Sequence, residues 1–254
     1  MNDPVLEVRT LTKTFRAGSR QVEAVKDLSF SLARGQTLAL VGESGSGKST
    51  AARLITGLET PDGGEIFVDG QDFSRPDREG KRQLRRKVQL VFQNPEASFS
   101  PRMTIGQALL EALGNFQPQL SRQEAEEKLE AQMAGMGLDP ALANRYPREL
   151  SGGQCQRAAI LRALAAEPAV LICDEATSAL DVLAQARILE ILEKLCKERR
   201  MSLLFISHDL ALASALCRQM VILRQGVCVE AGPTEKILAA PAHPYTKTLL
   251  ESVL

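Results

Sequence analysis

The sequence predicts an α/β fold built around a parallel β-sheet, and three observations lead to this prediction. Residues 169–176 (AVLICDEA) and 201–209 (MSLLFISHD) are continuous apolar runs that end in polar residues, which is typical of strands buried on both faces. A helical pattern over 182–198 lies between them, so the three segments form a βαβ unit. A third apolar run, 35–42, ends in glycine and is followed from Ser49 by another helical pattern.

The N-terminal third adds further strand candidates. Residues 5–15 and 24–32 alternate between apolar and polar side chains and are bounded by glycine or polar residues, as strands are. Residues 61–70 (PDGGEIFVDG) indicate a turn, a strand and a second turn, and residues 87–93 predict one more strand.

The middle of the chain is predicted to be helical. Residues 121–137 begin with Ser121 and carry Glu124 three positions later, the pattern of a capping box. Residues 77–87 are rich in charge, which we interpret as a solvated helix face, with an anion-binding patch as the alternative. Because the 254 residues contain no internal repeat, low-complexity segment or flexible linker, we expect one domain over 1–254.

The composition argues against a nucleic-acid-binding protein. Lys+Arg and Asp+Glu number 31 each, so the chain has no basic excess. Aromatic residues make up 4% and Trp is absent, which leaves few side chains for base stacking.

Cysteine usage and hydropathy predict a soluble protein of a reducing compartment. The five cysteines form no C-x-x-C pair, so we expect a cytosolic chain without a zinc or iron–sulfur site. The first residues lack a signal-peptide pattern, and no apolar run reaches the roughly 18–20 residues of a membrane helix. Such a chain would reach a membrane only through a partner.

Residues 42–49 (GESGSGKS) match the phosphate-binding pattern G-x-x-x-x-G-K-[ST] in full. The motif follows a predicted strand and precedes a predicted helix, the context expected of a P-loop. Its glycines, Gly42 and Gly47, let backbone N–H groups converge on a phosphate at a helix N-terminus. Lys48 could bridge the β- and γ-phosphates, and the Ser49 hydroxyl could bind Mg²⁺. The motif therefore predicts an ATP site.

Asp174 and Glu175 end the apolar run 169–176, at the edge where a parallel sheet binds ligands. We expect Asp174 to orient the Mg²⁺ shell and Glu175 to act as the general base on the attacking water. An acidic pair at a strand end is often only a helix N-cap, but a P-loop in the same chain favours the catalytic interpretation.

Two other polar residues also end predicted strands. Gln93 could contact both metal and water, and His208 could donate a hydrogen bond to the γ-phosphate. Taken alone, the first is an ordinary strand terminus and the second a structural histidine. His243, near the C-terminus, is expected to be non-catalytic.

Residues 149–157 (ELSGGQCQR) have the features of a second phosphate site that lacks a lysine. Ser151 and Gln154 form a capping-box pattern, but Gly152 and Gly153 each cost a helix about 1 kcal/mol relative to Ala. Glycines are expected where a ligand approaches the backbone, and a helix N-terminus is an anion site. Because the P-loop fills its own site, the expected guest is a phosphate held by another copy of the domain.

Together these motifs resemble the nucleotide-binding domain of ATP-binding cassette (ABC) transporters over essentially the whole chain. The motifs follow the family's order, which is P-loop at 42–49, Q-loop at Gln93, signature at 150–154, Walker B at 170–175, D-loop at 178–181 and switch histidine at His208. The resemblance implies a P-loop NTPase with a RecA-like core and an N-terminal antiparallel β subdomain. It also implies an inserted helical subdomain, about 95–165, that carries the signature.

The resemblance also implies the site residues. Phe15 matches the aromatic position that stacks on adenine, with a buried core residue as the competing interpretation. The catalytic residues would be Glu175, His208 and Gln93, and the Mg²⁺ ligands Ser49, Gln93 and Asp174. The implied nucleotide contacts are Phe15, Gly42, Ser44, Gly45, Gly47, Lys48, Ser49, Thr50, Ser151, Gly152, Gly153, Gln154 and Asp181.

Two segments look like the peptide/nickel group of bacterial importers, namely 89–104 and the tail 241–250 (PAHPYTKTLL). The resemblance implies an ATPase that powers import of short peptides, nickel or a related small solute. ATP would lie between the P-loop of one subunit and Ser151–Gln154 of another in a head-to-tail dimer, so the isolated chain would be a poor ATPase. Hydrolysis would reopen the dimer, and the groove around Gln93 would pass the motion to a membrane subunit.

The implied partners are a second ATPase subunit (a copy or a paralogue), integral membrane permease subunits and, indirectly, an extracytoplasmic solute-binding protein. The chain would lie peripherally on the cytoplasmic face of the inner membrane. The alternatives are a soluble ABC-type ATPase that acts on nucleic acid or ribosomes, which usually carries coiled-coil insertions or two cassettes, and an exporter ATPase, which the tail disfavours.

Overall fold

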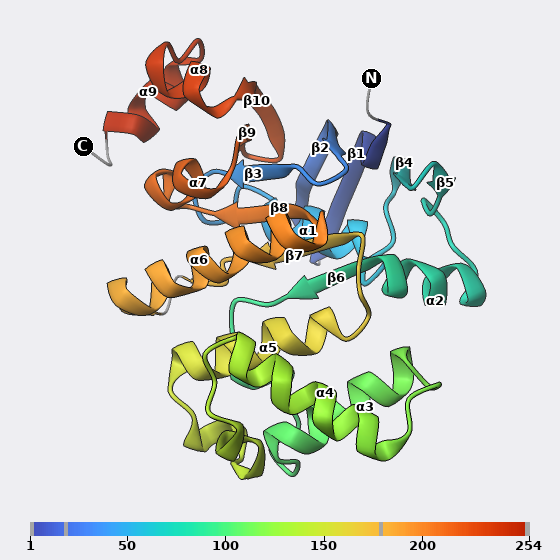
Figure 1. Ribbon diagram of the computed structural model, residues 1–254. Coiled ribbons are helices and arrows are strands. Elements are labelled where there is room, and N and C mark those ends of the chain that lie inside the picture. Colours follow the sequence, from blue (N-terminus) through green and yellow to red (C-terminus); the bar gives the residue numbers. More distant parts are fainter. Residues whose placement is uncertain (1–2, 18–19, 178–179, 252–254) are drawn as a thin grey trace.

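Two β-sheets form the framework of the computed structural model, which describes residues 3–17, 20–177 and 180–251 (Figure 1). The larger sheet has the strand order β10-β9-β3-β8-β7-β6, and all of its pairs are parallel except β9 with β10. Its strands are β3 (Thr37–Val41), β6 (Val88–Val91), β7 (Val170–Asp174), β8 (Ser202–Ser207), β9 (Gln219–Arg224) and β10 (Val227–Pro233).

The parallel strands are buried on both faces, as their continuous apolar runs predict. Along β3, Leu38 and Leu40 belong to one hydrophobic cluster, whereas Ala39 and Val41 belong to the other. This alternation follows from the two-residue period of a strand. Helix α1 (Lys48–Ile55) contributes to the first cluster, and α6 (Val182–Arg199) and α7 (Leu210–Leu216) to the second.

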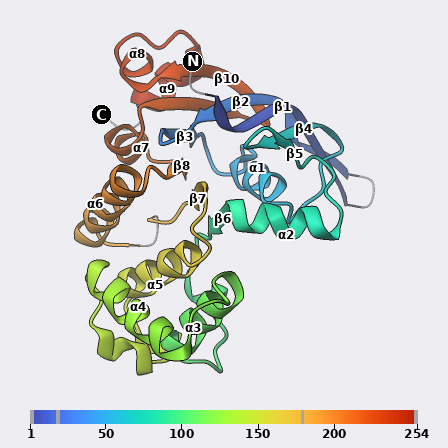
Figure 2. The same cartoon turned by 45° about the vertical axis from the view of Figure 1, so that its right-hand side comes forward.

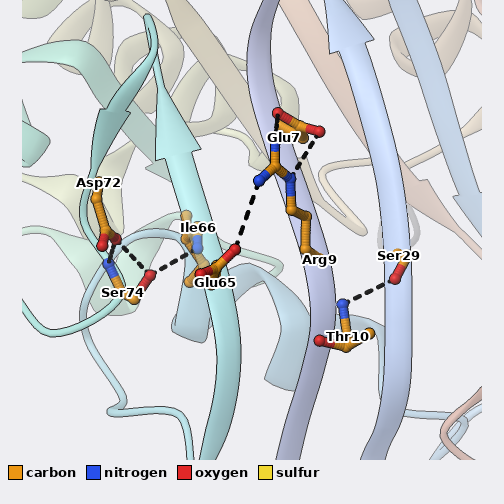
Figure 3. A network of polar contacts seen from close by, with 8 residues as sticks. All are labelled: Glu7, Arg9, Thr10, Ser29, Glu65, Ile66, Asp72 and Ser74. Carbon is orange, nitrogen blue, oxygen red and sulfur yellow. Dashed lines mark hydrogen bonds and ion pairs between the residues drawn. The ribbon is translucent and has the colours of Figure 1, made fainter.

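The second sheet is antiparallel, with strand order β2-β1-β4-β5. Its strands are β1 (Pro4–Ala17), β2 (Arg20–Ala33), β4 (Gly63–Val68) and β5 (Gln71–Asp72). Figure 3 shows Arg9 of β1 between two carboxylates, 2.9 Å from Glu7 on its own strand and 3.6 Å from Glu65 on β4. The Thr10 amide donates to the Ser29 hydroxyl of β2 at 2.8 Å. These contacts are exposed, and two of them connect β1 to its neighbours β4 and β2; exposed ion pairs of this kind add little to stability.

A helical lobe is inserted between β6 and β7. It holds α3 (Ile105–Phe116), α4 (Arg122–Gly135) and α5 (Gly152–Leu164), with short 3₁₀ turns at Glu96–Ser98, Pro140–Asn144 and Pro147–Glu149. Helix α4 starts at the capping box predicted for Ser121 and Glu124. In both views the lobe lies at the opposite end of the molecule from the C-terminal helices α8 (Thr234–Ala239) and α9 (Pro244–Glu251) (Figures 1 and 2).

The elements expected from the sequence are present. The βαβ unit is β7, α6 and β8, with β7 and β8 parallel. The charged segment forms α2 (Arg78–Lys87), in which only Leu84 is buried, as expected of a solvated face. All five cysteines are free thiols. Within the described ranges, no helix is long and apolar enough to cross a membrane.

Candidate functional site

The P-loop connects β3 to α1, and its surroundings demand glycine at two positions. A Cβ atom on Gly42 would lie 2.1 Å from the Leu223 carbonyl oxygen, and one on Gly47 would lie 2.2 Å from that of Ala24. Gly47 also precedes α1 with a φ of 106° and provides no side-chain cap. The first N–H groups of α1 therefore point out of the helix without a side-chain acceptor and are available to an anion.

A cavity of about 560 Å³ opens over this loop. It contains most of the P-loop residues expected at a nucleotide, together with Gln93 and Glu175. It also contains residues that the sequence analysis did not anticipate, from β2 and from the turn between β9 and β10. The lining residues are Gln21, Val22, Glu23, Ala24, Lys26, Ser44, Gly45, Gly47, Lys48, Ser49, Thr50, Gln93, Glu175 and Gln225.

The Lys48 ammonium is held inside the loop. It is 3% exposed, and its Nζ donates to the carbonyl oxygens of Gly42 at 2.7 Å and Glu43 at 2.8 Å. Burial lowers the pKa of Lys48, and the nearby carboxylates of Glu175 and Asp174 only partly oppose this. A cation that is desolvated in this way gains most from a phosphate that replaces the two carbonyls.

Asp174 and Ser49 form a pair of oxygen donors at the P-loop cavity, which Ser49 lines. The Ser49 hydroxyl donates to Asp174 Oδ1 at 3.0 Å. Burial raises the pKa of Asp174, while the bond from Ser49 lowers it in part. A buried carboxylate beside a hydroxyl suits Mg²⁺, which takes few protein oxygens and completes its shell with water and phosphate. The donor set fits the ion for this reason, although the described chain has no group of three or more His, Cys, Asp or Glu residues arranged to hold a metal ion by themselves.

Three of the predicted site residues lie around the carboxylate of Glu175. Gln93 Nε2 donates to Glu175 Oε2 at 2.8 Å, His208 Nδ1 lies 3.4 Å from Oε1, and Lys48 Nζ lies 4.0 Å from Oε1. Glu175 has a φ of 47°, a conformation that costs a non-glycine residue energy and clusters at functional sites. Its amide donates to the Ile206 carbonyl at 3.0 Å, which ties the turn to β8.

The signature residues start α5, outside the lining of this cavity. Ser151 and Gln154 form the expected capping box, with bonds of 2.9 and 3.3 Å. Cβ atoms on Gly152 and Gly153 would lie 3.2 Å from Leu180 Cδ2 and Ala184 Cβ, respectively. Leu180, just before α6, and Ala184, in its first turn, thus pack on the two glycines, which is a reason for glycine that the sequence analysis missed.

Two further predicted nucleotide contacts lie on other elements, Phe15 on β1 and Asp181 at the N-cap of α6. The Phe15 residue is 39% exposed, so the interpretation as a buried core residue is wrong. It pairs in register with Val22, which lines the cavity. Asp181 caps α6 by accepting the Ala184 amide at 2.9 Å. D-loop residues 178–179 lie outside the described residues.

Comparison with known proteins gives two matching families. The ABC transporter family matches residues 25–178, and the family described as oligopeptide/dipeptide transporter, C-terminal region, matches residues 229–254. The chain is 45% identical to the oligopeptide transport ATP-binding protein OppF of Haemophilus influenzae over 94% of this chain and 72% of that protein. It is 42% identical to the dipeptide transport ATP-binding protein DppF of Escherichia coli over 99% and 77% of the two chains.

Solved structures of similar shape are also ABC cassettes. A dimeric, post-hydrolysis state of the ATP-binding cassette MJ0796 bound to ADP and Pi has a TM-score of 0.83 and 28% identity, covering 90% of this chain and 98% of that one. The cbiO1 protein from Clostridium perfringens, part of the transporter complex cbiONQ, has a TM-score of 0.81 and 26% identity, covering 98% and 100%.

Proposed function

Because the chain belongs to the ABC transporter family of ATP-binding proteins, we propose that it is the ATPase subunit of a bacterial importer for short peptides. The observation that carries this proposal is the cluster of Lys48, Asp174 and Glu175 around one P-loop cavity. The match of residues 229–254 to the oligopeptide/dipeptide transporter C-terminal region supports a peptide cargo over nickel. The subunit would lie peripherally on the cytoplasmic face of the membrane.

The roles of the site residues follow from their positions. On nucleotide binding, Lys48 would exchange its bonds to the Gly42 and Glu43 carbonyls for the β- and γ-phosphates. Ser49 and Asp174 would hold Mg²⁺, which neutralises phosphate charge during transfer. Glu175 would accept the proton of the attacking water, and Gln93 and His208 would orient its carboxylate. Phe15 and Val22 would offer an apolar platform to the adenine.

The second ATPase subunit would supply the signature in trans. This is supported by the start of α6 beside Gly153, where Val182 and Leu183 are 78% and 83% exposed. Apolar side chains exposed to that degree next to a helix N-terminus suit a contact with another subunit. Hydrogen bonds to charged groups contribute roughly 1.5–3 kcal/mol each. Two such bonds at each of two sites, even partly realised, give on the order of 5 kcal/mol, close to the shift that closes an open equilibrium.

The permease subunits would contact the helical lobe, which we take as a subdomain over about 95–165. A cleft of about 830 Å³ separates α2 from the end of α3 and is lined by Arg82, Arg85 and Phe116, among other residues. Phe92, beside Gln93, is 36% exposed. A permease segment seated near these residues could move Gln93, and with it the carboxylate of Glu175.

The test is purification of the tagged chain from membranes, followed by reconstitution in vesicles. We expect integral membrane subunits to co-purify, and the vesicles to import short peptides in an ATP-dependent way. The Lys48→Ala variant is the control, which should assemble but not transport. An ATPase activity that nucleic acid stimulates, in a chain that purifies without membrane subunits, would contradict the proposal.

A further inference from the structure

The C-terminal helix α9 reaches the P-loop through one side chain. The Tyr245 hydroxyl accepts the backbone N–H of Glu43 at 3.1 Å, although the two residues are 202 positions apart. Tyr245 is only 6% exposed, and the Arg224 guanidinium lies 4.8 Å from the centre of its ring. Burial raises the pKa of Tyr245 despite the Glu43 amide and Arg224, which lower it. The phenol therefore stays neutral and can hold this bond at physiological pH.

The segment before α9 is built to place this tyrosine. His243 Nδ1 accepts the Tyr245 amide at 3.1 Å, so His243 serves as the cap of the helix. Pro244 occupies the first helical position, where its fixed φ and missing N–H cost nothing. Glu230 of β10 accepts the amides of Ala242 and His243 at 2.9 and 3.1 Å. In this triplet, His243 thus caps the helix, Pro244 begins it and Tyr245 contacts the P-loop.

The Glu43 peptide is a centre of hydrogen bonding in the P-loop. Its carbonyl oxygen accepts Lys48 Nζ at 2.8 Å and the Ser46 amide at 3.1 Å. When Lys48 turns toward a phosphate, the first of these bonds is lost. The bonds to Ser46 and Tyr245 then remain to hold the Glu43 peptide, and of these two the bond to Tyr245 connects it to another element. Ser46 is in turn held by the turn between β9 and β10, because its carbonyl accepts the Gly226 amide at 2.9 Å.

We propose that Tyr245 is a positioning residue for the P-loop, through which the C-terminal segment 229–251 sets the affinity of the site for nucleotide. The inference rests on the proposed binding of ATP at Lys48. A preorganised loop loses less conformational freedom when the phosphates bind. The bond between Tyr245 and the Glu43 amide should therefore increase the affinity for nucleotide. Because ADP and ATP use the same loop, both should be affected alike.

The reverse effect follows from thermodynamic linkage. If Tyr245 favours the loop conformation that binds nucleotide, nucleotide must favour the docked conformation of α9 by the same factor. Bound nucleotide should therefore slow amide hydrogen exchange in residues 244–251, in a part of the chain that does not line the cavity. A tail that is merely attached to the core would show no such response.

The experiment compares Tyr245→Phe with the unaltered chain by calorimetric titration with ADP and with ATP. The substitution keeps the ring on Arg224 and removes only the hydroxyl. We expect both nucleotides to bind about fivefold more weakly, the effect of about one net hydrogen bond. In the assembled transporter, KM for ATP should rise by the same factor while kcat stays within about twofold. Nucleotide should no longer slow exchange in α9.

Thr248→Ala is the matched control in the same helix. The Thr248 hydroxyl bonds to the Pro244 carbonyl within α9 at 3.3 Å, so its loss should leave nucleotide affinity unchanged. A second pair tests the cap: His243→Ala should weaken binding in the same direction, and His243→Asn should restore it, since Asn is an effective N-cap. Equal affinity in Tyr245→Phe and the unaltered chain would overturn the proposal. Failure of the unaltered chain to bind nucleotide would instead count against the proposed function.

Discussion

Replacement of Glu175 by Gln is the most direct perturbation of the proposed chemistry. Gln has the same shape and can still accept the hydrogen bond from Gln93 Nε2, which now lies 2.8 Å from Oε2. What is lost is the ability to take a proton from water. General-base catalysis is worth about 10²–10⁴ in rate, or about 3–5 kcal/mol of activation free energy. We expect kcat for ATP hydrolysis to fall by that factor.

Nucleotide binding should survive this substitution, because the same change removes a negative charge from the cavity. The Glu175 carboxylate lies 4.0 Å from Lys48 Nζ, where it competes with an incoming γ-phosphate for the ammonium group. Its neutralisation should leave ATP affinity equal or higher. ATP-bound dimers should then accumulate, since the step that reopens them is slowed.

The assay is single-turnover hydrolysis in the assembled transporter at saturating ATP, with binding measured separately. Glu23→Gln is the matched control, because Glu23 lines the same cavity and pairs with Lys26 at 3.1 Å. That variant neutralises a carboxylate that is not in contact with Gln93 or His208. Its rate of ATP hydrolysis should therefore stay within about threefold of that of the unaltered protein. A single-turnover rate of Glu175→Gln within tenfold of that of the unaltered protein would show that Glu175 is not the general base.

Three other outcomes are expected. Ser151→Arg should leave ATP binding at the P-loop intact but abolish ATP-driven dimers, and unchanged dimers in sedimentation would contradict the trans-phosphate role. Burial raises the pKa of Asp174 above its value in the unfolded chain, so the folded chain loses stability as the pH rises from the unfolded pKa through the folded one. Asp174→Asn should therefore raise Tm without nucleotide by about 2–4 °C for each kcal/mol regained, should lose this advantage in acid, and should not hydrolyse ATP. Burial raises the pKa of Cys155 to about 11, which leaves about one thiolate in a thousand near pH 8. Maleimide should label the half-buried Cys228 first and reach Cys155 only after unfolding.

The sequence predicts the parallel core and the P-loop because their signals are local. Each buried strand is a continuous apolar run, and the eight residues of the P-loop carry their own glycines and lysine. The capping box at Ser121 is equally local, since it depends on two residues three positions apart. Where structure follows from short-range spacing, the expectations agree with the fold.

The missed parts of the site depend on contacts between distant segments. Val22 lines the cavity because β2 passes beside the P-loop, where the Ala24 carbonyl oxygen would lie 2.2 Å from a Cβ on Gly47. Gln225 comes from a turn near the other end of the chain. The bond between Tyr245 and Glu43 spans 202 positions. Only the folded chain brings these residues to one loop.

The packing of α5 on α6 changes how the signature glycines are understood. A Cβ on Gly153 would press on Ala184 at 3.2 Å, so the start of α5 is fitted closely to the start of α6. Thr177 is itself tied to this region, because its carbonyl accepts the Leu180 amide at 3.1 Å and Gln185 Nε2 of α6 at 3.0 Å. Thr177 lies two residues after Glu175. Close-packed groups of this kind shift together rather than independently. A phosphate bound at Ser151, as proposed, would therefore act on the segment that follows Glu175 of the same subunit, and Gly153 would serve this packing contact as well as the ligand.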